Sequence, residues 1–149
     1  YAREEQLDEK DMEVWREKRN ECRIKIKDYT NTETGENMSP ELTWDAVDGA
    51  TQYVVIMIDD AWLHMDVFTT ETSLAEGAVE RGARGEQYVG PYPPKGTTHT
   101  YTVFVFALKD EMGKVPLAFD GGGNSISKIF DGLDVDVNGN SGNVLAGCP

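Results

Sequence analysis

Residues 100–108 form a segment rich in aromatic and β-branched side chains, directly behind a proline-rich loop. Such a composition is typical of a strand that is buried on both faces. The loop, residues 90–96, reads G-P-Y-P-P-K-G. Its prolines fix φ and remove backbone donors, while its glycines relieve steric limits. Because His99 lies between this loop and the strand, we expect a rigid scaffold to hold a polar group for a ligand.

The remaining pattern predicts a mainly β domain with few helices. Residues 53–58 are a continuous apolar run of strand length, and residues 126–133 have the apolar spacing of one short amphipathic helix, with Asn124 or Ser125 as its N-cap. Residues 71–89 are read as a loop with at most one helical turn. Further strands are predicted at 24–26, 42–44, 64–70 and 144–146, and a charged helix at 4–21.

Length and charge limit the domain organisation and the partners. The 149 residues suit one domain, with residues 1–22 as an N-terminal helical arm and 23–149 as the domain proper. The formal net charge of −13 argues against binding to nucleic acid or to anionic membrane surfaces. No apolar run reaches the length of a transmembrane segment, and no signal peptide is visible. The acidic chain, the cysteine pair and the arm favour an exported or cell-surface location over the cytoplasm.

The two cysteines, Cys22 and Cys148, lie near opposite ends of the chain. A disulfide between them would close a long loop, worth about 3–5 kcal/mol on the chain-entropy model. Two buried thiols are the alternative, because a sequence does not show whether two Cα atoms approach each other. Neither cysteine belongs to a C-x-x-C motif, so zinc and thioredoxin-type sites have no support.

Polar residues gather where the predicted strands begin and end. Asp59 and Asp60 end one buried strand, and His64 opens the next. His99 and Tyr101 open a third and are two residues apart, so on a strand they face the same side. Two imidazoles and a phenol can supply directed donors to an anion. Since histidine titrates near pH 6.5, we expect anion affinity to rise as the pH falls toward about 6.

Several motifs, in order along residues 37–146, resemble the phosphatidylethanolamine-binding protein family and its bacterial Raf-kinase-inhibitor-like branch. Residues 37–44 read N-M-S-P-E-L-T-W, which is similar to the family's N-x-S-P-x-L-x-W. Residues 55–64 resemble the strand, the D-P-D-A-P box and the tryptophan-histidine that follows it. The most specific match is G-P-Y-P-P-K-G-T-T-H-T-Y at 90–101, against G-P-x-P-P-x-G-x-x-H-R-Y. Residues 142–146, G-N-V-L-A, resemble G-H-V-L-A.

The resemblance implies an antiparallel Greek-key β-sandwich with two or three peripheral helices and a small pocket for phosphate, phospholipid head groups or carboxylates. The residues carried over to that pocket are Asp59, His64, Gly90, Pro91, His99 and Tyr101. This chain departs from the motifs at three places. The prolines of the D-P-D-A-P box are missing, Thr100 replaces the arginine of H-R-Y, and Asn143 replaces the histidine of G-H-V-L-A. These departures alter the rim of the pocket more than the fold.

The resemblance implies binding rather than catalysis, so we expect a non-enzyme without a cofactor that binds phosphate or phosphoethanolamine and regulates a protein partner. A module that binds or inhibits proteins without a ligand is one alternative. A two-histidine, one-carboxylate metal site with Asp59 or Asp60 is another. Hydrolysis by Ser39 or Ser73 lacks the G-x-S-x-G elbow. Residues 134–139 read D-V-D-V-N-G, as at the start of an EF-hand loop, but position twelve is Leu145, so a surface turn is expected.

Overall fold

The computed structural model describes residues 22–24, 38–79, 88–93, 96–112 and 122–148, which form two antiparallel sheets and one helix. The predicted helix at 4–21 lies outside these residues. The three-stranded sheet has the order β1-β2-β5 and the four-stranded sheet the order β4-β3-β6-β7. The elements are β1 Cys22–Ile24, β2 Leu42–Trp44, β3 Gln52–Asp59, β4 Trp62–Thr69, β5 Ser73–Leu74, β6 Thr102–Leu108, α2 Ile126–Leu133 and β7 Val144–Cys148.

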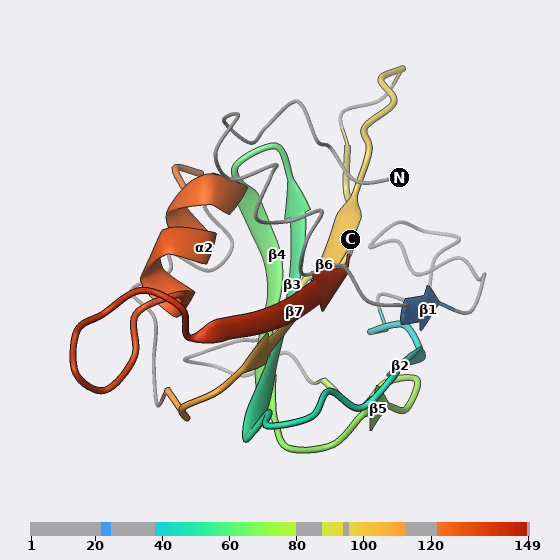
Figure 1. Ribbon diagram of the computed structural model, residues 1–149. Coiled ribbons are helices and arrows are strands. Elements are labelled where there is room, and N and C mark those ends of the chain that lie inside the picture. The colour runs from blue at the N-terminus through green and yellow to red at the C-terminus, as the bar shows by residue number, and fades with distance from the viewer. Residues whose placement is uncertain (1–21, 25–37, 80–87, 94–95, 113–121, 149) are drawn as a thin grey trace.

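The two central strands, β3 and β6, are buried on both faces and divide the core in two. On one face, Ile56 and Phe106 pack with the apolar side of α2. On the other face, Val55 and Val105 pack with Trp44 of β2. Because successive side chains of a strand alternate between faces, one strand supplies both cores. Figure 1 shows the resulting layers, with α2 on one side of the four-stranded sheet and β1, β2 and β5 on the other.

Helix α2 forms where its apolar spacing predicts it. Ile126, Ile129, Phe130 and Leu133 are buried. Phe130 meets Phe106 of β6 edge to face, with ring centroids 6.1 Å apart. The Ser125 hydroxyl accepts a hydrogen bond from the Lys128 amide at 3.4 Å, so Ser125 is the N-cap. This cap satisfies one of the amides that the first helical turn leaves without a partner.

The mainly β class and the strands at 42–44, 53–58 and 144–146 are confirmed, with small differences at their ends. β6 begins at Thr102, so His99 and Tyr101 precede the strand rather than open it. The expectation of a plain loop at 71–89 is wrong in its first part, because Ser73–Leu74 pairs with β2 as β5. A strand of two residues is too short to show an alternating pattern. Of the strand predicted at 24–26, only Ile24 is described, as the last residue of β1.

The N-M-S-P segment has a structural role centred on Ser39. This residue is buried, its hydroxyl accepts a hydrogen bond from the Val79 amide at 3.0 Å, and its carbonyl accepts one from Gly77 at 2.8 Å. Gly77 has φ +73°, a conformation that side-chain-bearing residues rarely adopt. Ser39 therefore ties the start of β2 to the segment that follows β5. Because this hydroxyl is buried and already accepts a bond, its environment does not suit a nucleophile.

The two cysteines lie on outer strands of the two sheets, Cys22 on β1 and Cys148 on β7. Cys148 is a buried thiol at the end of β7. The Cys22 side chain lies outside the described residues, although its backbone pairs with that of Trp44. The disulfide stays a prediction, which intact mass measured with and without reductant will test.

The described helix is not long and apolar enough to cross a membrane.

Asp66 is a half-buried carboxyl on β4, and burial raises its pKa above the usual value. It pairs with Ile56 and so lies on the helix-facing side of the sheet. An acid whose pKa is raised by folding weakens stability above that pKa, and the penalty disappears below the unfolded-state pKa. Asp66→Asn is therefore expected to raise the melting temperature at pH 7 and to have no such effect at about pH 3.

The gain from Asp66→Asn should be below about 1 kcal/mol, because a partly exposed carboxylate keeps much of its hydration. Thermal unfolding at several pH values measures it. A matched Glu71→Gln variant, on an exposed residue next to the same strand, should change neither the melting temperature nor its pH dependence. A loss of stability in Asp66→Asn at pH 7 would contradict this account of the site.

Candidate functional site

A β-bulge in the β3–β4 hairpin introduces His64. Met57 pairs with Met65 and Ile58 with Leu63, so His64 is an extra residue on β4. A bulge of this kind changes the direction of side chains and is frequent beside functional sites. Here it lets Leu63 enter the helix-side core while Met65 enters the other core. His64 is therefore placed at the end of the sheet without occupying a regular core position.

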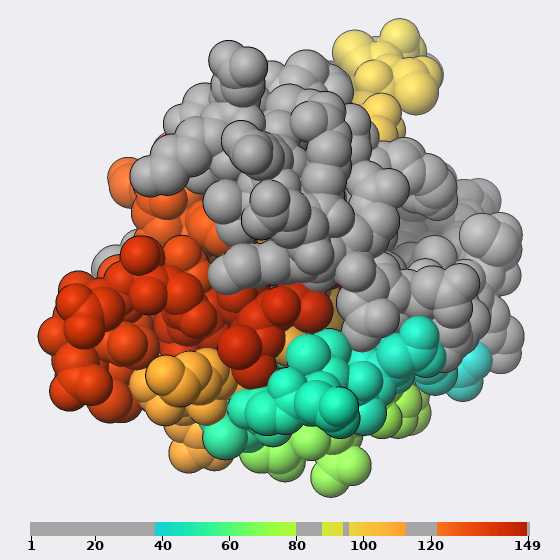
Figure 2. All heavy atoms as spheres, in the orientation of Figure 1, coloured from blue at the N-terminus to red at the C-terminus, as the bar shows by residue number. Residues whose placement is uncertain are grey.

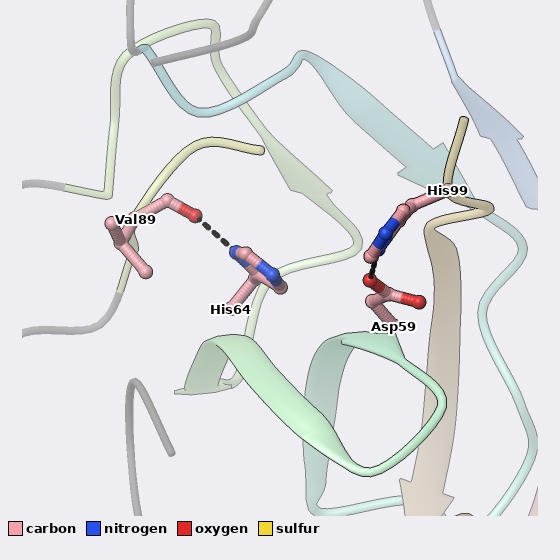
Figure 3. A network of polar contacts seen from close by, with 4 residues as sticks. All are labelled: Asp59, His64, Val89 and His99. Atoms are coloured by element: carbon pink, nitrogen blue, oxygen red, sulfur yellow. Dashed lines mark hydrogen bonds and ion pairs between the residues drawn. The ribbon is translucent and has the colours of Figure 1, made fainter. Parts of the chain in front are cut away.

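The His64 ring is fixed by the backbone of Val89. His64 is only 8% exposed, and its Nδ1 lies 2.9 Å from the Val89 carbonyl oxygen. The Val89 amide in turn donates to the His64 carbonyl at 2.8 Å. Since a carbonyl oxygen can only accept, Nδ1 carries the hydrogen and Nε2 is left for other partners. Figure 3 shows the ring between Val89 and the pair formed by His99 and Asp59.

His99 Nδ1 donates a hydrogen bond to Asp59 Oδ2. Asp59 is the last residue of β3, and its side chain is 14% exposed against 36% for His99. The segment that leads into β6 projects from the body of the molecule, so His99 is open to solvent (Figures 1 and 2). The carboxylate orients the imidazole in the way that the partner of a metal-bound or catalytic histidine does.

Tyr101 connects the two imidazoles. Its ring lies edge-on to His64, with centroids 5.1 Å apart, and stacks on His99 at 6.3 Å. Burial, and then the negative charge of Asp59, raises the pKa of the Tyr101 phenol above its usual range. The hydroxyl therefore stays protonated at neutral pH and keeps a hydrogen to donate.

Gly90 and Pro91 are buried and directly follow Val89, the residue that holds His64. The structure thus brings Asp59, His64, His99 and Tyr101 together, and places Gly90 and Pro91 on the adjoining segment. We call the four side chains the imidazole cluster. Asp60, the other aspartate of the pair, is exposed in the β3–β4 turn with φ 50°.

The alternative sites find less support. No group of three metal-ligating side chains exists among the described residues, which contradicts the two-histidine, one-carboxylate site there. The surface turn predicted at 134–139 is present, and a bridge between Val135 and Ser141 closes it. Within it, Asp136 accepts hydrogen bonds from the amides of Asn138 and Asn140, and these bonds lower its pKa.

Asn143, which stands where the motif has histidine, is part of the scaffold. It is fully buried, and its side chain accepts from the Asp110 amide at 2.8 Å and donates to the Leu133 carbonyl at 3.1 Å and the Asp110 carbonyl at 3.3 Å. These bonds join the ends of β6 and α2 to the start of β7. The sequence signals an amide at this position but not the three partners that it connects.

Comparisons with known proteins agree with this architecture. The model of the phosphatidylethanolamine-binding protein family matches residues 17–132. A protein named UPF0098 from Methanothermobacter thermautotrophicus is 30% identical over an alignment of 95 residues, which covers 62% of that protein and 50% of this chain. The chain thus spans less than two thirds of that relative.

Two crystal structures have a similar fold. E. coli YbcL, described as a new member of the mammalian PEBP family, gives a TM-score of 0.59 at 22% identity over 87% of this chain and 93% of its own. CT736 from Chlamydia trachomatis, described as a putative PEBP homolog, gives 0.55 at 22% identity over 87% and 94%.

Proposed function

Because the chain belongs to the phosphatidylethanolamine-binding protein family, we propose that it is a binding protein, not an enzyme, whose imidazole cluster takes a small anionic group. The observation that carries the proposal is the convergence of His64, Tyr101 and the His99–Asp59 pair at one end of the four-stranded sheet. Three polar rings from two separate parts of the sequence meet there. Their hydrogens can serve the oxygens of a phosphate or a carboxylate.

Each member of the cluster has its own role in this proposal. His64 and Tyr101 direct hydrogens at the anion, and His99 adds a third donor that Asp59 orients. Gly90 and Pro91 shape the wall beside His64. The exposed position of His99 leaves the imidazole cluster accessible from solvent. A phosphate group carried by a lipid and a free phosphate ester present the same oxygens, so the two sources have to be separated by experiment.

Titration with phosphoethanolamine tests the proposal. Binding followed by calorimetry should be at least about 10-fold tighter at about pH 6 than at about pH 8, because protonated imidazoles donate from both nitrogens. Ethanolamine, which lacks the phosphate, is the matched control and should not bind. Equal affinity at both pH values would show that histidines are not the donors. Sedimentation with phosphatidylcholine vesicles, with and without phosphatidylethanolamine, then decides whether a membrane-bound head group is also accepted.

A protein partner is a second candidate, favoured by two exposed aromatic side chains. Trp62, at the start of β4, is 45% exposed, and Tyr92, in the proline loop, is 72% exposed. Exposed aromatic residues are enriched where proteins bind one another. In this alternative the chain regulates its partner through these aromatic side chains, whether or not the imidazole cluster holds an anion.

A further inference from the structure

The two imidazoles of the cluster have the same hydrogen-bonding constraint. Nδ1 of His64 donates to the Val89 carbonyl, and Nδ1 of His99 donates to the Asp59 carboxylate. Each ring therefore has only Nε2 left for a ligand. In a neutral imidazole whose Nδ1 carries the hydrogen, Nε2 is a lone pair and can only accept. A neutral ring thus presents a lone pair, and not a hydrogen, to an approaching anion.

The net charge of the cluster also disfavours an anion unless the rings are protonated. With both rings neutral, Asp59 gives the cluster a charge of −1. One proton on either ring brings it to zero, and only a second proton makes it positive. Tyr101 adds no charge, because burial and Asp59 raise its pKa. Other ionisable side chains on the described elements around His64 are Asp60, exposed in the turn, Asp66, half-buried on β4, and Tyr88, buried beside β4.

We infer that the cluster binds an anion only together with two protons, one on Nε2 of each histidine. This inference rests on the proposed function and specifies how the site is regulated. Above the pH range in which histidines titrate, the affinity for the anion falls about 10-fold per unit rise in pH for each proton that has to be taken up. Two protons therefore give a fall of about 100-fold per pH unit. The protein would then bind its anion in a mildly acidic setting and release it over a narrow rise in pH.

Sulfate is the probe that isolates the protons of the protein, because its own charge does not change between about pH 5.5 and about pH 8. Calorimetry in buffers of different ionisation enthalpy counts the protons taken up for each sulfate bound. At about pH 7.5 we expect a count close to two, together with a loss of affinity of about 100-fold per pH unit.

Two aspartate variants make the count specific. Asp59→Asn removes the charge and offers His99 an amide that can donate to Nδ1, which leaves the hydrogen of a neutral His99 on Nε2. Only His64 then has to take up a proton, and the count should fall to about one. Asp60→Asn, the matched control one residue away in the exposed turn, should still give two. Circular dichroism establishes that both variants fold.

The outcomes distinguish failure of the two-proton inference from failure of the proposed function. If sulfate binds with an uptake of one proton or none, or if Asp59→Asn still takes up two, the two-proton inference is wrong while the anion site stands. If neither sulfate nor phosphoethanolamine binds even at about pH 5.5, the proposed function itself is wrong.

Discussion

Replacing both His64 and His99 with alanine is expected to weaken phosphoethanolamine binding at about pH 6 by at least about 100-fold. Hydrogen bonds to charged groups contribute about 1.5–3 kcal/mol each, and the double variant removes two of them. No other histidine exists in the chain to replace them. Calorimetry with the wild type in parallel measures the loss.

His64 is buried, so its removal also tests the fold, and two further variants keep the result interpretable. His64→Gln retains a polar side chain of similar length, and with His99→Gln it should lose binding to a similar extent while keeping the melting temperature near that of the wild type. Thr98→Ala, on the exposed neighbour of His99, should bind as the wild type does. Anion binding retained by the folded glutamine variant would exclude the histidines as donors. A protein partner that the same variant still binds would favour the exposed Trp62 and Tyr92 as the functional contacts.

Replacing Asn143 with alanine is expected to lower the free energy of unfolding by about 3 kcal/mol. The substitution removes three side-chain hydrogen bonds and leaves the Asp110 amide and the Leu133 carbonyl without that partner. Each buried polar group that loses its partner costs about 1–3 kcal/mol. Urea unfolding followed by tryptophan fluorescence measures the change.

Asn140→Ala is the matched control for Asn143. Asn140 is exposed, and it bonds to Asp136 through its backbone amide, which alanine retains. We expect a change within about 0.5 kcal/mol for this variant. If Asn143→Ala is equally mild, the connection between β6, α2 and β7 does not depend on its amide. Binding by a folded Asn143→Ala protein should be unaffected, because Asn143 lies in the scaffold and not in the imidazole cluster.

The central strands could be predicted because a strand that is buried on both faces has an uninterrupted apolar sequence. Residues 53–58 and 103–108 are apolar without interruption, and the spacing of Ile126, Ile129, Phe130 and Leu133 is helical. The sequence indicates less clearly which distant strands pair with each other. The two residues of β5 are strand only because β2 lies beside them, so no local pattern identifies them.

The polar residues of the cluster could be selected from the sequence, but the contacts that determine their chemistry could not. The bulge at His64 is a shift of register by one residue between two strands, which neither strand shows alone. The partner of His64 Nδ1 is a backbone carbonyl, and every residue has one. The motifs themselves divide into two kinds: those around Asp59, His64 and His99 build the cluster, whereas Ser39 and Asn143 hold the frame.

The bulge has a consequence for how such a site can change over evolutionary time. Because His64 is additional to the pairing of Leu63 and Met65 with β3, neither core depends on its side chain for the alternation of that strand. Natural variation or a designer can therefore exchange the residue at this position, and with it the preferred ligand, while the framework inherits the same packing. Diversification at position 64 would be limited to side chains that fit the same buried space beside Val89, without the compensating substitutions that a change inside either apolar layer demands.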